Sequence, residues 1–260
     1  MRLAAKDYVT AGNLLAGMGV AVAGVQGHIY EALLWLLVAM VFDLCDGIVA
    51  RLTGTQNAFG GSFDNVCDHM SWGIAPSFVL FGAYRPVFES LYGSEGYLAD
   101  GLAFIIASVP MLCASLRFAR FNTYNYDVSG IWLGFPRPAS AFALVSLVNS
   151  DFFALGTELQ LGTIPLVLFF GYLNVSTRPY PSHHHKGATP KILWGYYTIF
   201  VGGVVGLLIG GPLLNAIPNS WAADFTLFCM TSYAIFGWSA IPEEDRKAAR
   251  EEIRRTESEG

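Results

Sequence analysis

Long apolar segments fill this sequence from end to end, and they limit what the chain can fold into. Eight of them reach or approach the roughly 20 residues that a helix needs to cross a bilayer. Only 13% of the residues are charged and 53% are apolar, whereas a soluble domain carries about 25% charged residues. We therefore expect an all-α integral membrane protein, a bundle of about eight transmembrane helices. The expected spans are Tyr8–Val25, Ile29–Arg51, Phe63–Tyr84, Leu98–Arg117, Ala139–Phe153, Thr163–Val175, Ile192–Leu214 and Trp221–Ile241.

The basic residues predict how the chain is oriented, because cytoplasmic loops are enriched in Lys and Arg. With eight spans and a cytoplasmic N-terminus, all 15 Lys and Arg residues except Arg85 fall at cytoplasmic ends or loops. Both termini are then cytoplasmic. We expect a multi-pass protein of the plasma membrane, with a transmembrane domain over residues 1–242 and a charged cytoplasmic tail over residues 243–260.

Four carboxylates interrupt the apolar pattern within 26 positions. At helical spacing, the first two share a face with Gly47 and Ala50, and the last two share a face with Gly60. The intervening Thr53–Asn57 is rich in turn formers. If the two helices pack antiparallel across this turn, the carboxylates converge beside a hollow left by the small residues. The four acids are Asp43, Asp46, Asp64 and Asp68.

Such a quartet of acids favours metal binding. An ionised carboxylate is costly to hold away from water unless a cation compensates it. Carboxylates on rigid helices suit Mg²⁺ or Mn²⁺, four acids are enough to hold two such ions, and a two-metal site suits displacement at phosphorus.

Two other interpretations of the acids are open. They could pair with arginines to pin the two helices together, but only Arg51 is available locally to balance four charges. They could also line an ion or proton pathway in a transporter. A transporter would more naturally place its polar groups on broken helices near the midplane, often in two repeats, and neither feature is evident in the sequence.

The same stretch resembles the signature of a known family. From Asp43 to Asp68 it reads D-x2-D-G-x2-A-R-x8-G-x3-D-x3-D, which is similar, without a gap, to the signature of the CDP-alcohol phosphotransferase (phosphatidyltransferase) family. The resemblance implies that Asp43, Asp46 and Asp64 are metal ligands. It implies that Asp68 touches the second metal and acts as general base. It also implies two divalent ions as cofactors, a CDP-linked lipid as donor, contact with membrane lipids, and a homodimer; no nucleic-acid partner is expected.

Other residues acquire roles through the same resemblance. Gly47 and Ala50 would leave room for the nucleotide, and Gly60 would belong to the same nucleotide and phosphate surface. Arg51 would steady phosphate charge. Asn13, near the start of the first span, is similar to an asparagine that faces the cytidine pocket in relatives. A hydrogen bond between helices is the alternative role for Asn13.

A second cytoplasmic stretch narrows the resemblance. The R-x-x-R-F-N run that starts at Arg117, followed by the proline-flanked Phe135–Ala141, looks like the membrane-embedded phosphatidylserine synthases of the family. Arg137 departs from that pattern, in which we expect a small or apolar residue. A guanidinium can hold an amino-acid carboxylate with two hydrogen bonds. We therefore expect an acceptor-binding group formed by Arg117, Arg120 and Asn122.

The resemblance implies a CDP-diacylglycerol (or CDP-archaeol)–serine O-phosphatidyltransferase that transfers the phosphatidyl group to the serine hydroxyl and releases CMP. Glycerol phosphate, inositol phosphate and choline are alternative acceptors within the family. The two arginines could instead contact lipid headgroups. The sequence decides neither between Mg²⁺ and Mn²⁺ nor between the two lipid anchors.

Two further polar segments follow. His183, His184 and His185 are adjacent in sequence and cannot all face one ion, so we expect a basic interfacial loop there. The tail from Glu243 to Gly260 alternates acids and bases at helical spacing, which predicts a short solvated helix.

Overall fold

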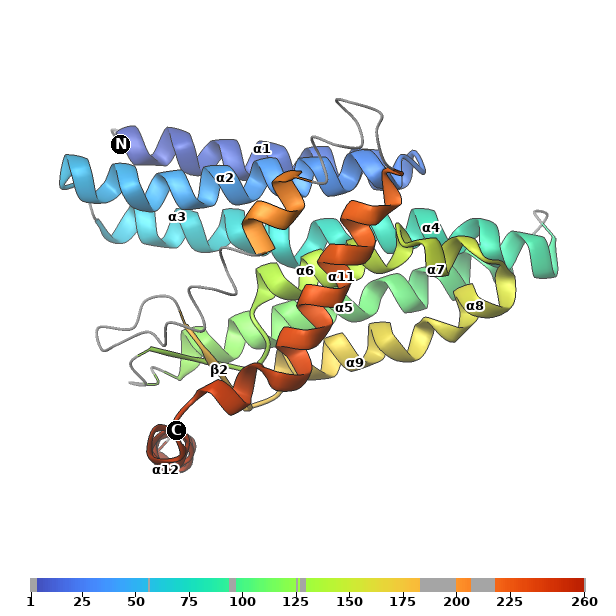
Figure 1. Cartoon of the computed structure of the whole chain (residues 1–260). Helices are drawn as coiled ribbons and strands as arrows, with labels where there is room; N and C mark the ends of the chain where they lie inside the picture. The colour runs from blue at the N-terminus through green and yellow to red at the C-terminus, as the bar shows by residue number, and fades with distance from the viewer. Residues whose placement is uncertain are drawn as a thin grey trace.

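The computed structural model describes residues 4–55, 57–93, 97–124, 126, 130–182, 200–206 and 218–259. Helices make up most of this part of the chain, and many of them lie with their axes roughly along one direction (Figure 1). The elements are α1 (Ala5–Val25), α2 (Ile29–Thr53), α3 (Ala58–Asp68), the π-helix η1 (His69–Ile74), α4 (Ala75–Tyr92), α5 (Tyr97–Thr123), β1 (Ile131–Leu133), α6 (Arg137–Val148), α7 (Asp151–Ala154), α8 (Thr157–Gly162), α9 (Ile164–Val175), β2 (Pro179–Pro181), α11 (Ser220–Phe236), the 3₁₀ turn η3 (Gly237–Ala240) and α12 (Glu243–Glu259).

The expected class, an all-α membrane protein, agrees with the helices observed. Within the described residues, 4 helices are long and apolar enough to cross a bilayer: α1, α2, α5 and the segment Thr157–Val175. A fifth span arises if α11 and α12 count as one broken helix, although the two are bent by 94°. The expected seventh span, Ile192–Leu214, lies mostly outside the described residues. The count of eight spans and the orientation of the termini stay predictions.

The third expected span, Phe63–Tyr84, belongs to a longer run. The chain stays helical from Ala58 to Tyr92, through α3, η1 and α4. The π-helix begins directly after Asp68, and wider turns of this kind are frequent at functional sites. It changes the direction in which the side chains after Asp68 point.

The turn predicted between the two acidic helices is confirmed. Helix α2 ends at Gly54, whose φ of 61° is a left-handed conformation that glycine adopts without strain. Helix α3 begins after Asn57, whose side-chain oxygen accepts a hydrogen bond from the Gly60 amide at 2.7 Å. The chain therefore reverses here, and α2 and α3 run antiparallel (Figure 1).

Helix α1 is the element that holds this part of the bundle together. It packs against α2, α3, η1 and α4. At its crossing with α4, a Cβ on Gly82 would collide with the Gly24 carbonyl oxygen, and a Cβ on Gly24 would lie 2.7 Å from the Val79 backbone. Small residues let membrane helices approach this closely. The glycines therefore fix the position of α1 against α4.

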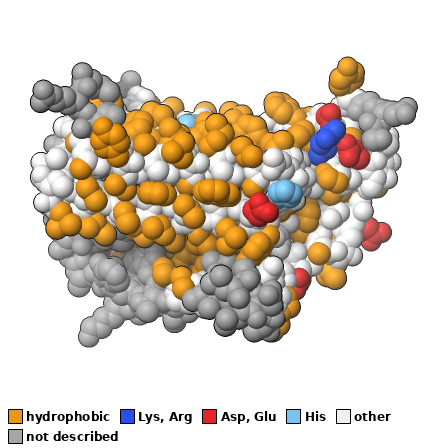
Figure 2. Space-filling model, turned by 90° about the horizontal axis from the view of Figure 1, so that it is seen from above, with side chains coloured by type: hydrophobic (Ala, Val, Ile, Leu, Met, Phe, Trp, Pro, Cys, Tyr) orange, Lys and Arg blue, Asp and Glu red, His pale blue; other side chains and the backbone are white. Residues whose placement is uncertain are grey.

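The surface of the bundle suits a lipid environment. Helices α1 and α2 expose large apolar side chains, including Leu15, Met18, Leu44 and Ile48. The face seen in Figure 2 is mainly hydrophobic, and its few charged side chains gather towards one end. A surface of this kind is expected where lipid, rather than water, covers the helices.

The chain segment that leads into α6 is fixed from both sides. Strands β1 and β2 pair antiparallel, with Ile131 opposite Pro181. The expected tail helix forms as α12, but one face of it is not solvated: Ala249 and Ile253 are buried against Leu133 of β1. This packing holds the segment that carries the first residue of α6 to the end of the bundle that contains Asp68.

Candidate metal and substrate site

The spacing predicts that all four acids converge, and three of them do so. Asp43 of α2 and Asp64 and Asp68 of α3 each offer a carboxylate oxygen within 4.8 Å of the other two. All three side chains are partly buried. Like charges at this separation repel strongly in a partly desolvated site, so the arrangement calls for bound cations or protons.

Asp46 lies beside this trio rather than inside it. Its side chain is buried, and Thr10 of α1 donates a hydrogen bond to its Oδ2 at 2.8 Å. It also lies close enough to Asp64 for their charges to repel. The structure thus places the fourth predicted ligand at the edge of the cluster, with α1 fixing its orientation.

Asp68 has the most donors around it. Its Oδ1 accepts hydrogen bonds from Asn13 Nδ2 at 3.1 Å and from Trp72 Nε1 at 3.0 Å. Its Oδ2 lies 3.6 Å from Arg137 Nη2. Asn13 therefore makes the helix-to-helix hydrogen bond that was its alternative role. Because two donors occupy Oδ1, Oδ2 is the oxygen of Asp68 that is left for a ligand or a proton.

Trp72 and Arg137 also lie at this site, and neither was predicted there. Trp72 lies one turn after Asp68, and an indole N–H in an apolar span needs a hydrogen-bond acceptor. The spacing could therefore have predicted the hydrogen bond between Trp72 and Asp68. The π-helix brings its ring to the carboxylate. Arg137 is far from Asp68 in sequence, and its departure from the family pattern was the only indication that it is unusual.

The cluster is not neutralised by arginines. Among the described residues, Arg137 makes the one ion pair found with the trio, and three carboxylates face that single guanidinium. Arg51, the local candidate, is exposed. Asp64 Oδ1 is buried and has no hydrogen-bond partner in the described part of the chain. A divalent cation would satisfy that oxygen, so the donor set fits a metal site.

The small residues around the cluster divide into two kinds. A Cβ on Gly47 would meet only the Arg51 guanidinium, at 3.6 Å, so Gly47 faces open space. Ala50 is buried one turn further along. Gly60, in contrast, is in close contact with the side chains of Lys6 and Asp7. The structure therefore gives Gly60 a packing contact between α1 and α3.

The expected acceptor residues bind backbone carbonyls. Arg117 Nη1 donates to the oxygens of Phe135 at 3.1 Å and Asn174 at 3.0 Å. Arg120 donates from Nη1 to Val175 O at 2.7 Å and from Nη2 to Ser176 O at 3.1 Å. The carbonyls of Asn174, Val175 and Ser176 lie at the end of α9, so the two guanidinium groups cap that helix, and Arg117 also ties it to the segment before α6. The third member, Asn122, is exposed near the end of α5.

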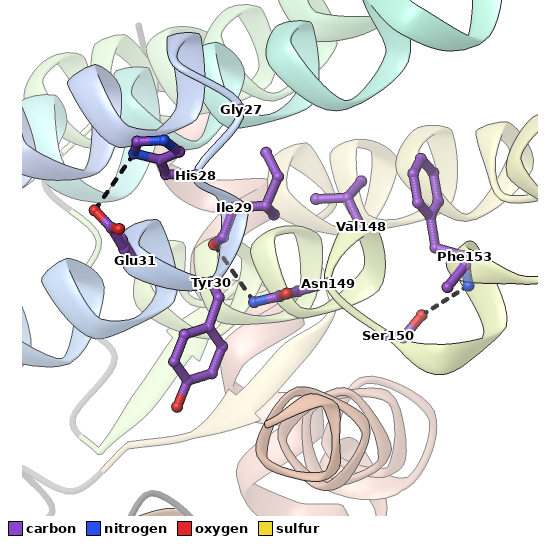
Figure 3. Close-up of a pocket in the computed structure, with 10 residues that line it drawn as sticks. Gly27, His28, Ile29, Tyr30, Glu31, Val148, Asn149, Ser150 and Phe153 are labelled. Atoms are coloured by element: carbon purple, nitrogen blue, oxygen red, sulfur yellow. Dashed lines mark hydrogen bonds and ion pairs between the residues drawn. The ribbon is translucent and has the colours of Figure 1, made fainter. Parts of the chain in front are cut away.

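A pocket of about 470 Å³ lies elsewhere, where α1 turns into α2. Figure 3 shows His28 paired with Glu31 and the Asn149 amide directed at the carbonyl of Ile29. At 1.5 Å per residue, this turn is about 22 Å along α2 from Asp43. The pocket is therefore separate from the acid cluster.

The fold and the cluster together define a helical membrane protein with an acidic site suited to divalent cations. The family model for CDP-alcohol phosphatidyltransferase matches residues 4–174, and the chain belongs to this family. A CDP-diacylglycerol–serine O-phosphatidyltransferase of Methanocaldococcus jannaschii is 33% identical over 234 residues, which cover 89% of this chain and 90% of the relative. One of the same name from Helicobacter pylori (strain J99) is 32% identical and covers 68% of this chain and 71% of its own. An archaetidylserine synthase of Methanothermobacter thermautotrophicus is 25% identical, covering 72% and 73% respectively.

Proposed function

We propose that this protein is a CDP-diacylglycerol (or CDP-archaeol)–serine O-phosphatidyltransferase. The observation that carries the proposal is the convergence of Asp43, Asp64 and Asp68 in a chain of this family. The names of the similar proteins support serine as the acceptor, and they include both a diacylglycerol and an archaetidyl product. The proposed active site faces the cytoplasm from a multi-pass position in the plasma membrane, and the proposed assembly is a homodimer.

The acids hold the cofactors in this proposal. Asp43, Asp46, Asp64 and Asp68 would bind two divalent ions, Mg²⁺ or Mn²⁺. When bound, these ions offset the negative charge of the diphosphate and stabilise the attacking and leaving oxygens. Thr10 fixes Asp46 by its hydrogen bond, so the ligand set is anchored to three helices.

Asp68 acts as the general base. Asn13 and Trp72 hold its Oδ1, so Oδ2, which lies 3.6 Å from Arg137 Nη2, would take the proton of the serine hydroxyl. The serine oxygen then forms a bond to the β-phosphorus of the CDP-lipid, the bond from that phosphorus to the bridging oxygen breaks, and CMP leaves with the electron pair. The phosphatidyl group is transferred and no oxidant or reductant is required.

The other predicted residues surround this centre. Gly47 and Ala50 make room for the nucleotide, and Arg51 and Gly60 lie on the donor side. Asn13 contributes through Asp68 in this proposal. On the acceptor side, Arg117, Arg120 and Asn122 help to form the serine site in this proposal, the two arginines by holding the backbone around the end of α9. Alanine at Arg120 should then raise the KM for serine.

Incubation of the purified protein with CDP-diacylglycerol, a divalent metal and labelled serine tests the proposal. We expect a serine-containing lipid by mass spectrometry, released CMP, and loss of both on metal chelation. Parallel reactions with glycerol phosphate, inositol phosphate and choline test the other acceptors. A carboxylate-lined transporter would release no CMP, so metal-independent or absent CMP release with every acceptor would contradict the assignment.

A further inference from the structure

Arg137 has the most unusual surroundings of the arginines near the site. It is the first residue of α6, and its side chain is only 15% exposed. Its guanidinium carbon lies 5.6 Å from the centre of the Phe118 ring, and Nη2 lies 3.6 Å from Asp68 Oδ2. Its Nη1 is buried and has no hydrogen-bond partner among the described residues. A buried guanidinium donor without an acceptor is costly, and this cost points to a missing anion.

The neighbouring arginines have more of their terminal donors engaged, although Arg120 Nε is also buried without a partner among the described residues. Arg117 and Arg120 use their terminal nitrogens on four backbone carbonyls around the end of α9. An incoming carboxylate would have to displace those bonds. Arg137 offers Nη1 without such competition, and its one ion pair is with the proposed base itself.

The short length of serine determines which cation its carboxylate can reach. In serine, three bonds separate the hydroxyl oxygen from the carboxyl carbon, so the carboxylate stays within about 4 Å of the hydroxyl. A hydroxyl that donates its proton to Asp68 therefore brings the carboxylate next to whatever cation lies beside Asp68. In the described part of the chain, Arg137 is the cation paired with that side chain.

We propose that Arg137 binds the carboxylate of the acceptor amino acid and thereby selects for a β-hydroxy acid over neutral alcohols. This inference rests on the proposed function and adds the residue that recognises the acceptor. Arg117 then acts as a positioning residue, because its hydrogen bond to the Phe135 carbonyl holds the chain two residues before Arg137. Pro136 and Pro138, which restrict the backbone on either side, fix the start of α6.

The test compares wild type with Arg137→Gln and Arg137→Lys in purified full-length protein. The control is Arg254→Gln, which removes an exposed arginine from α12. Four quantities are measured: equilibrium binding of labelled L-serine, the KM for serine, the KM for CDP-diacylglycerol, and CMP release to water without serine. The rate ratio of serine to serinamide, which lacks the negative charge, measures selectivity directly.

We expect Arg137→Gln to weaken serine binding and raise its KM by about tenfold or more, since a charge-assisted hydrogen bond is lost. The KM for CDP-diacylglycerol should rise by a smaller factor than the KM for serine, CMP release should fall by a larger factor with serine than without it, and the preference for serine over serinamide should fall towards one. Lysine keeps the positive charge but lacks the planar guanidinium, so the KM of Arg137→Lys for serine should lie between those of wild type and Arg137→Gln. It also serves as the test if the glutamine variant does not fold.

The inference is overturned if serine binding and KM match those of wild type. It is equally overturned if CMP release with and without serine falls by the same factor, because Arg137 would then act on Asp68 or on the diphosphate. These results leave the proposed function intact, since wild type would still form the serine lipid. Failure of wild type to form it would instead reject the proposed function.

Discussion

The carboxylates at the two ends of the bundle differ in how far nearby cations balance their charge. At one end Arg85 pairs with Glu89 at 3.1 Å and with Asp100 at 2.7 Å, and all three side chains are at least a quarter exposed. At the other end three carboxylates face one another, and the nearest arginine contact is 3.6 Å. The first group is balanced by its own cation and by water. The second lacks enough positive charge within the described chain, which distinguishes a ligand site from a surface ion pair.

Substituting an acid in the trio should have the largest effect. We expect Asp64→Asn to lower metal-dependent CMP release by at least about 10³-fold, because it removes a carboxylate from the centre of the proposed metal site. The matched substitution at the other end, Asp100→Asn, should leave the rate unchanged. Chromatography of the detergent-solubilised variants verifies folding.

The thermal stability of the Asp64→Asn variant is a second test of whether the two ends of the bundle differ. In metal-free protein, removing one of three mutually repelling carboxylates should raise the apparent Tm or leave it unchanged. A clear fall in Tm would mean that Asp64 is a structural ion-pair partner, and the two ends of the bundle would then be alike.

Adding one methyl group to the open space beside the acids should weaken binding of the CDP-lipid. Gly47 and Gly61 both lie in helices, and a Cβ on either would meet little of the surrounding protein. Gly47→Ala should therefore fold normally but raise the KM for CDP-diacylglycerol by roughly 10- to 100-fold, as overpacking at a contact does. Gly61→Ala is the control and should not change it. Equal KM values for both variants would place the nucleotide elsewhere.

The hydrogen bond from Trp72 to Asp68 should have a smaller effect. Trp72→Phe keeps an aromatic ring against Phe142, at 6.0 Å between centroids, but removes the N–H. We expect kcat to fall by about tenfold with little change in either KM, because the orientation of the base is loosened. Trp238→Phe, which removes an exposed indole bond to Ile235, is the control. An unchanged kcat would show that Asp68 is positioned without Trp72.

The smallest effect is expected at the balanced end. Arg85→Gln removes exposed ion pairs, and exposed pairs contribute little to stability. We expect the apparent Tm and CMP release to match wild type within error. A loss of activity would mean that the Arg85 group communicates with the acid cluster.

Spacing along the chain was enough to predict the convergence of Asp43, Asp64 and Asp68 and the turn between their helices. Both depend on the local geometry of adjacent helices. The position of Asp46 was less predictable, because Thr10 of another helix takes its carboxylate oxygen. The metal role of all four acids stays a prediction.

Contacts between segments that are far apart along the chain could not be predicted from the sequence. The surroundings of Arg137 depend on how α6 approaches α3, and the capping of α9 by Arg117 and Arg120 depends on how α5 meets α9. The π-helix after Asp68 had no local signal that we recognised. The expected count of eight spans came from the lengths of the apolar segments. Helix α6 has 12 residues and is shorter than a full span, so its presence does not test that count.

Titration of the purified, metal-free protein with Mn²⁺, followed by electron paramagnetic resonance, tests the central claim most directly. Four acids anchored on α2 and α3 should bind two ions per chain, Mg²⁺ should displace them, and Asp64→Asn should reduce the number bound while Asp100→Asn should not. Stoichiometric binding that survives Asp64→Asn, or no binding at all, would contradict the assignment of the acid cluster as the metal site.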